Sequence, residues 1–110
     1  RKIHEIATKY QLSTNYETLD IFHNTFNHKQ AVEVIKEAAK LTGLNITEST
    51  LPFRWGEDFG LFTQKYKGAM FCLGAGENSP ALHHADYDFN DELIAKAIVV
   101  FKNISLLINS

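Results

Sequence analysis

The residues best suited to chemistry lie in the stretch LGAGENSPALHHADYDFND, residues 73–91, which follows an apolar run. Histidine and carboxylate side chains hold metal ions and transfer protons, and glycine lets the backbone approach a ligand closely. In open α/β sheets, ligand sites gather beyond the carboxyl ends of strands, which is where this stretch is expected. Its candidates are Gly74, Gly76, Glu77, His83, His84 and Asp86. The alternative is an ordinary polar turn, because a lone G-x-G does not complete a dinucleotide-binding fingerprint.

The histidine pair has a functional and an ordinary interpretation. Neighbouring side chains point in different directions, so His83 and His84 would be one metal ligand and one bystander, or simply two loop histidines. A zinc site needs three or four ligands, and the sequence has no H-x-x-x-H or C-x-x-C spacing to supply them. An independent zinc site that adds His23 and His28 requires distant segments of the chain to meet.

A second polar pair, Glu57 and Asp58, precedes an apolar segment with helical spacing. Its ordinary role is to interact with the positive end of a helix dipole, and its functional alternative is the rim of a polar site. Trp55 either lines the same opening or belongs to the core. Cys72 lies within the apolar run and is expected to be a buried, inert side chain. No Ser-His-Asp or Cys-His arrangement is recognisable.

The composition bounds the classes of protein and partner. The chain has 110 residues, 45% of them hydrophobic, with 11 basic and 13 acidic side chains and a net charge of −2. This even balance provides no electrostatic footprint for nucleic acid or for an anionic membrane. The single cysteine excludes an internal disulfide framework, and no apolar run approaches the roughly 20 residues of a membrane helix. We expect one globular, cytoplasmic domain.

Hydrophobic periodicity predicts the elements that must position these residues. Helices are expected over about 1–12, 27–43, 57–66 and 90–108. Asn27 is the expected N-cap of the second helix and Gly43 the residue just after its C-terminus. Gly60 weakens the prediction for the third helix. The first helix lacks a start signal, which favours a chain that continues upstream.

Strands are expected between these helices. Residues 16–26 are predicted to form a half-exposed strand, 45–51 a weak strand, and 69–73 a central strand that is buried on both faces. Alternating helices and strands predict an α/β fold in which parallel strands are joined by right-handed crossovers.

Three motifs, WGEDFGLF, KGAMFCLGAGE and PALHHADYDFNDELI, resemble a known family. They are similar to the C-terminal part of the aminoacylase and carboxypeptidase family of zinc metallopeptidases, especially its N-acyl-amino-acid, hippurate and auxin-conjugate amidohydrolases. The resemblance is strong over residues 52–95 and fainter over 1–50. It implies that residues 27–110 are the C-terminal third of a three-layer α/β/α catalytic domain. Residues 1–26 would be the last helix and strand of a lid domain that forms dimers.

The same resemblance assigns roles to individual residues. It implies that His83 is one ligand of a two-zinc centre and that His84 is a bystander. The residues that it places at the rim of the site or beside the substrate are Glu57, Asp58, Gly74 and Gly76. The other metal ligands of the family, its general-base glutamate and its lid histidine have no counterpart in this sequence. No catalytic residue is therefore expected in this chain.

Two hypotheses of function follow. In the first, the chain is the C-terminal part of a zinc-dependent amidohydrolase or peptidase that acts on N-acyl amino acids or small peptides. It would be inactive alone, with the upstream part of the same enzyme as its partner and a homodimer as its assembly. In the second, it is a non-catalytic binding or assembly module that keeps the packing of the family. The first predicts an exposed strand edge and apolar face, and the second does not.

Overall fold

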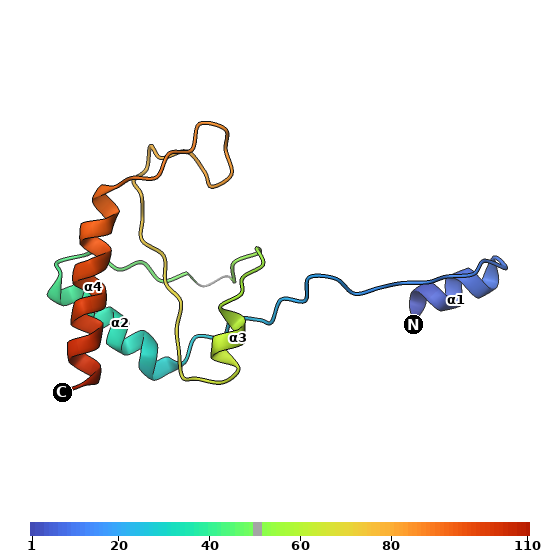
Figure 1. Cartoon of the computed structure of the whole chain (residues 1–110), viewed down its shortest axis with the longest axis horizontal. Helices are drawn as coiled ribbons and strands as arrows, with labels where there is room; N and C mark the ends of the chain where they lie inside the picture. Colours follow the sequence, from blue (N-terminus) through green and yellow to red (C-terminus); the bar gives the residue numbers. More distant parts are fainter. Residues whose placement is uncertain (50–51) are drawn as a thin grey trace.

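The fold, a computed structural model in which residues 1–49 and 52–110 are described, consists of helices joined by extended segments. The helices are α1 (Lys2–Lys9), α2 (Lys29–Leu41), α3 (Gly60–Thr63) and α4 (Glu92–Ile108). In Figure 1, α2 and α4 lie together, while α1 lies far away at the end of an extended segment. The radius of gyration is 20.0 Å, whereas a compact chain of this length has about 13 Å.

The predicted α/β architecture, with its three-layer α/β/α catalytic domain, is wrong. Residues 16–26 and 69–73 run as extended segments, and the described part of the chain contains no strand. Residues 45–49 form no strand either, and the rest of the predicted 45–51 strand lies outside the described residues. A strand requires a second strand to pair with its N–H and C=O groups, and these segments do not pair with one another.

Helix α2 ends where the sequence predicts. Gly43 has a left-handed backbone with φ of 69°, and its N–H donates to the carbonyl oxygen of Lys40 at 2.9 Å. The N–H of Leu44 donates to the carbonyl oxygen of Ala39 at 3.0 Å. These two bonds form a Schellman motif, which satisfies carbonyl groups that the helix end would leave unpaired.

Helix α4 also begins as predicted, whereas α3 is much shorter than predicted. The Oδ1 atom of Asn90 accepts a hydrogen bond from the N–H of Glu92, the first residue of α4, at 3.0 Å, and Asp91 occupies the N-cap position. In α3, Gly60 is buried against the chain at His23, and a Cβ atom added at Gly60 would lie 2.1 Å from the carbonyl oxygen of His23. This glycine therefore permits a close crossing of two segments, and the helix is limited to the single turn that follows it.

The packed centre of the molecule is the contact between α2 and α4. Ala38 of α2 is fully buried and Val100 of α4 is 1% exposed. The small side chain of Ala38 lets the two helices approach closely, as ridge-and-groove packing requires. Phe71 in the extended segment lies against Phe101 of α4, with ring centroids 5.6 Å apart. Residues 69–73 are thereby held along α4.

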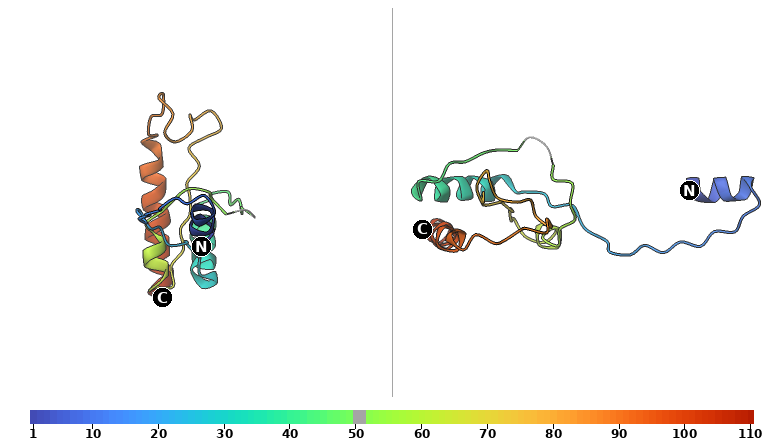
Figure 2. Two further views of the ribbon diagram at one scale, coloured as in Figure 1. Left: turned by 90° about the vertical axis from the view of Figure 1, so that its right-hand side faces the viewer. Right: turned by 90° about the horizontal axis from the view of Figure 1, so that it is seen from above.

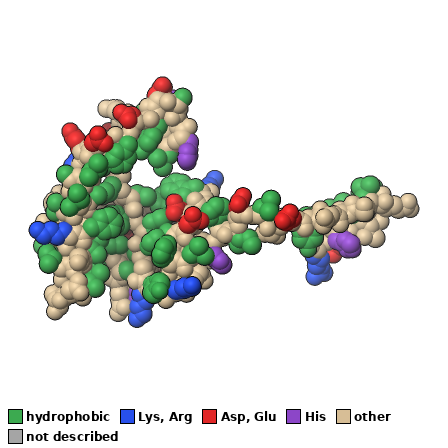
Figure 3. Space-filling model, in the orientation of Figure 1, with side chains coloured by type: hydrophobic (Ala, Val, Ile, Leu, Met, Phe, Trp, Pro, Cys, Tyr) green, Lys and Arg blue, Asp and Glu red, His purple; other side chains and the backbone are tan. Residues whose placement is uncertain are grey.

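Most of the large apolar side chains on the helices are not covered. The accessible surface is 10063 Å², whereas a folded protein of this mass exposes about 6,200 Å². Leu41 of α2 and Ile98 of α4, which lie on apolar faces of these helices, are each 61% exposed. Cys72, predicted to be buried, is exposed, since residues 69–73 run as an extended segment and not as a central strand of a sheet. Figure 3 shows hydrophobic side chains spread over one face of the molecule.

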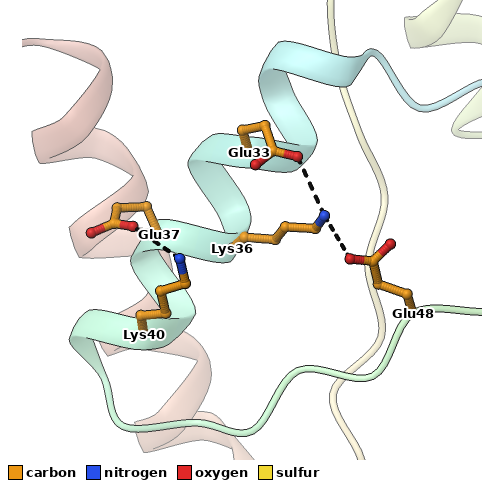
Figure 4. Close-up of polar contacts among 5 residues, drawn as sticks. All are labelled: Glu33, Lys36, Glu37, Lys40 and Glu48. Atoms are coloured by element: carbon orange, nitrogen blue, oxygen red, sulfur yellow. Dashed lines mark hydrogen bonds and ion pairs between the residues drawn. The ribbon is translucent and has the colours of Figure 1, made fainter.

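A cluster of charges ties the segment after α2 back onto that helix (Figure 4). The Nζ atom of Lys36 lies 2.6 Å from Glu48 Oε1 and 3.3 Å from Glu33 Oε1. Hydrogen bonds to Glu48 and Glu33 raise the pKa of Lys36 above its ordinary value, so the amine stays charged. Lys40 pairs with Glu37 on the same helix at 3.6 Å. None of the helices in the described part of the chain has both the length and the apolar character that crossing a membrane requires.

Asn27 is not the N-cap that the sequence predicts, because His28 occupies that position. Instead, the Asn27 side chain pairs with the backbone of Met70. Its Nδ2 donates to the Met70 carbonyl at 2.8 Å, and its Oδ1 accepts from the Met70 N–H at 2.9 Å. The N–H of His28 also donates to the carbonyl of Gly68 at 2.9 Å. The Asn27 side-chain amide and the His28 backbone N–H together pair with residues 68–70 as the backbone of a neighbouring strand would.

Replacing Asn27 with Ala removes both of these bonds and should lower the free energy of unfolding by about 1–2 kcal/mol. Urea denaturation followed by circular dichroism measures this change, and hydrogen exchange of the Met70 amide reports the local loss. Asn45→Ala is the matched control, since Asn45 is exposed as Asn27 is but its side chain makes no hydrogen bond with a described residue. Asn27→Asp keeps the acceptor and should retain more protection at Met70 than Asn27→Ala does. Equal protection in the two Asn27 variants would contradict the assigned pairing.

Candidate functional site

Residues 74–89, here called the histidine loop, connect the extended segment 69–73 to α4 and lie at the top of Figure 1. Two hydrogen bonds shape the part that carries the histidines. The N–H of His84 donates to the carbonyl of Ala81, and the N–H of Tyr87 donates to the carbonyl of His84, each at 3.0 Å. His83 lies within the first of these two turns with φ of 68°, in the left-handed region that few residues other than glycine adopt. The chain therefore reverses at His83 and exposes its side chain.

The two histidines differ in their contacts. The Nδ1 atom of His84 accepts a hydrogen bond from the N–H of Asp86 at 3.2 Å and lies 3.6 Å from Asp86 Oδ2. The imidazole of His83 makes no hydrogen bond or ion pair with any described residue. One nitrogen of His84 is thus used within the loop, while both nitrogens of His83 are available to a ligand.

The residues of this chain do not fit a complete metal centre. Among residues 1–49 and 52–110, no three His, Cys, Asp or Glu side chains lie close enough together to hold a metal ion. The four-histidine zinc site considered from the sequence does not form, because His23 and His28 are not brought to the histidine loop. One imidazole cannot supply the three or four ligands that zinc requires.

The acidic pair predicted at the site rim lies at the start of α3. The carbonyl of Asp58 accepts a hydrogen bond from the N–H of Leu61 at 3.0 Å, so the pair precedes a helical turn as predicted. Glu57 is half-buried and Asp58 is exposed. Figure 1 shows α3 at the level of α2, away from the histidine loop. The structure does not bring this pair together with His83, and its place at a substrate rim stays a prediction.

The two glycines of the loop are not equivalent. Gly76 has φ of 109°, whereas Gly74 does not adopt the left-handed region. A Cβ atom added at either position would meet nothing within 4 Å. Gly76 is therefore needed for the backbone conformation, and Gly74 simply faces open space. Close approach of a ligand to either glycine stays a prediction.

Between the histidine loop and α4 lies an apolar groove of about 520 Å³. Leu82, next to His83, is on its loop side, and Ile98 is on its helix side. This groove could not be predicted from the sequence, because the loop residues and the α4 residues that line it meet only in the folded chain. Residues 74–95, which include the loop side of this groove, contain Glu77, Asp86, Asp88, Asp91 and Glu92 but no Lys or Arg.

Comparison with known proteins gives the following similarities. The sequence profile of a family described as peptidase family M20/M25/M40 matches residues 10–106. An uncharacterized hydrolase of Staphylococcus epidermidis is 28% identical over 112 aligned residues, which cover 94% of this chain and 29% of that protein. The hippurate hydrolase of Campylobacter jejuni is 37% identical over 84 residues, covering 74% of this chain and 22% of that enzyme.

The chain thus spans less than a third of the length of these curated relatives. No solved structure shows significant similarity to it. The match to the family profile includes the histidine loop, α2 and most of α4.

Gly76→Ala should destabilise the histidine loop by about 1–2 kcal/mol, because the added Cβ disfavours the positive φ at this position. Gly74→Ala is the matched control and should change stability by less than about 0.5 kcal/mol. Urea denaturation of the two variants measures the difference, and amide exchange at His84 and Tyr87 locates it in the loop. A larger loss in Gly74→Ala than in Gly76→Ala would contradict this geometry.

Proposed function

The chain belongs to peptidase family M20/M25/M40, and on that premise we propose that it forms part of a metal-dependent amidohydrolase. The proposed reaction is hydrolysis of the amide bond of N-acyl amino acids or small peptides. The single observation that carries this proposal is the match over residues 10–106, which includes the histidine loop. The 37% identity to a hippurate hydrolase over 84 residues favours the amidohydrolase branch.

The contribution proposed for this chain is limited to the groups that it contains. His83 supplies one imidazole ligand to a zinc centre, and Glu57, Asp58, Gly74 and Gly76 border the substrate. The free nitrogens of His83 and its left-handed backbone support this role, since the loop presents the side chain outward. No catalytic step is assigned to a residue of this chain, because the described residues do not form a metal site by themselves.

The other ligands are proposed to come from the rest of a longer enzyme of which the chain is the C-terminal part. Residues 1–26 would belong to its lid domain and residues 27–110 to its catalytic domain, with a homodimer as the assembly. The chain spans 29% of one relative and 22% of another. The extensive exposed apolar surface supports this proposal over a free-standing module, for which such a surface is not expected.

Alone, the 110-residue chain should bind zinc weakly and hydrolyse no N-acyl amino acid, because one imidazole is not a zinc site. Isothermal calorimetry with zinc, together with an assay of hippurate hydrolysis on the same sample, measures both properties. Tight binding that His83→Ala abolishes, accompanied by turnover, would show a complete site in this chain. That result would overturn the proposed division of ligands.

The role of His83 is tested by transferring the histidine loop into a complete relative. In the Campylobacter hippurate hydrolase, the matched segment is replaced by the corresponding residues of this chain. The chimera should bind zinc and hydrolyse hippurate, and His83→Ala should reduce both the bound zinc and the rate by at least about tenfold. His84→Ala, the matched control, should retain most of both. A folded chimera whose zinc content is unchanged by His83→Ala would refute the assignment.

A further inference from the structure

We propose that the extended connection between α1 and α2 positions the acidic pair, Glu57 and Asp58, by resting on the two glycines that flank this pair. Phe22 and His23 of the connection make the contacts and are its positioning residues. The inference rests on the proposed function, because it takes the acidic pair to border the substrate. It deepens that function by assigning a role at the site to residues that precede α2.

The first contact joins Phe22 to Gly56, the residue before the acidic pair. A Cβ atom added at Gly56 would lie 3.1 Å from Cδ2 of the Phe22 ring and 3.2 Å from Cε2 and Cγ. Two carbon atoms pack best at about 3.5–4.0 Å, so the ring would have to move to admit even an alanine. The Phe22 ring therefore rests on the backbone of Gly56.

The second contact is between two stretches of backbone. Gly60, the first residue of α3, is buried, and a Cβ atom added there would overlap the carbonyl oxygen of His23 and lie 2.8 Å from its carbonyl carbon. A carbonyl group cannot turn aside as the end of a flexible side chain can, because it belongs to a planar peptide unit. The connection can cross α3 at this point only over a residue that has no side chain.

Both glycines are needed for space and not for the shape of their own backbone. Neither Gly56 nor Gly60 has a positive φ, so the left-handed conformations that favour glycine are not the reason for either residue. What the two glycines share is contact with the connection. They are four residues apart, with Glu57 and Asp58 between them. The connection therefore holds the backbone on both sides of the acidic pair.

The connection remains attached beyond these contacts. The N–H of His28 donates to the carbonyl of Gly68, and the side chain of Asn27 pairs with the backbone of Met70. Figure 1 shows this part of the chain passing α3 on its way to α2. Residues 22–28 are therefore fixed to the segment before α3, to α3 itself and to the segment after it.

The same contacts link the connection to the place of the two carboxylates. Helix α1 contacts none of the other helices in the described residues, and the right-hand view of Figure 2 places it apart from them. The backbone of the acidic pair leads directly into α3, since the carbonyl of Asp58 accepts a hydrogen bond from the N–H of Leu61. A shift of residues 22 and 23 therefore moves the backbone that carries Glu57 and Asp58.

Amide exchange at Leu61 and Phe62 in the 110-residue chain tests the contact at Gly60. Alanine favours a helix more than glycine does, so Gly60→Ala would slow exchange at both amides if nothing lay against position 60. With the connection in contact, the substitution should instead speed exchange at both by at least about tenfold, because the added methyl group displaces the connection. Slower or unchanged exchange would overturn the proposal.

Gly68→Ala is the matched control, since a Cβ atom added at Gly68 would lie at an ordinary contact distance of 3.6 Å from Cζ of Phe59. It should change neither exchange rate by more than about threefold. In the wild-type chain, nuclear Overhauser contacts should join the Phe22 ring protons to the α protons of Gly56, and Gly60→Ala should remove them. Their absence from the wild-type chain would refute the assigned contact.

A pair of substitutions tests the contact at Gly56 without relying on a single variant. In the wild-type chain, Gly56→Ala should speed exchange at Leu61 by at least about tenfold, because its methyl group pushes the Phe22 ring away. In the Phe22→Ala chain there is no ring to meet, so Gly56→Ala should change this rate by less than about threefold. Equal effects of Gly56→Ala in the two chains would mean that Phe22 does not rest on Gly56.

The consequence for the substrate is measured in a chimera of the Campylobacter hippurate hydrolase that carries residues 22–91 of this chain. Gly60→Ala should raise the KM for hippurate by at least about threefold and leave the bound zinc unchanged, because the connection acts through the acidic pair and not through His83. Gly68→Ala should change neither. An unchanged KM in Gly60→Ala would overturn the positioning role and leave the proposed function standing. Zinc binding that survives His83→Ala would overturn the proposed function instead, while the exchange rates still decide whether the connection holds the acidic pair.

Discussion

The contact between α2 and α4 positions nearly everything else in this chain. Ala38 and Val100 are buried there, and no side chain elsewhere among the described residues is buried as completely. Phe71 rests on Phe101 of the same helix, so the extended segment that leads into the histidine loop is anchored to α4. The loop leaves that segment and returns to the start of α4, which fixes both of its ends. The placement of His83 therefore depends on a helix pair that contains no functional residue.

This helix pair leaves much of the apolar surface uncovered. Burial of apolar area is the main favourable term in folding, and here only small patches of it are removed from water. The pairing of Asn27 with Met70 and the charge cluster around Lys36 hold extended segments in place, but neither covers a hydrophobic face. These exposed apolar side chains are the surface that, under the proposed function, other segments of a longer enzyme would cover.

Helices could be predicted from the sequence because their signals are local. The spacing of apolar residues, Gly43 after α2 and Asn90 before α4 lie within a few residues of the features that they specify. Strands could not be predicted in this way, because residues 69–73 have the composition of a buried strand but require a partner that the described chain does not supply. Asn27 and Gly60 show the same limit: each contacts a distant segment, so nothing near them in the sequence reveals the role.

Residue types and spacing alone do not distinguish the two histidines of the loop. Spacing alone left His83 and His84 equivalent, and the choice of His83 came from resemblance to a family. The structure adds a physical difference, since His84 uses Nδ1 to accept a bond from Asp86 while His83 lies at a left-handed position with both nitrogens free. A histidine whose nitrogen is already used to shape its loop must give up that bond to bind a metal through the same atom. The backbone reversal at His83 carries no such cost, because it is already made before any ligand arrives.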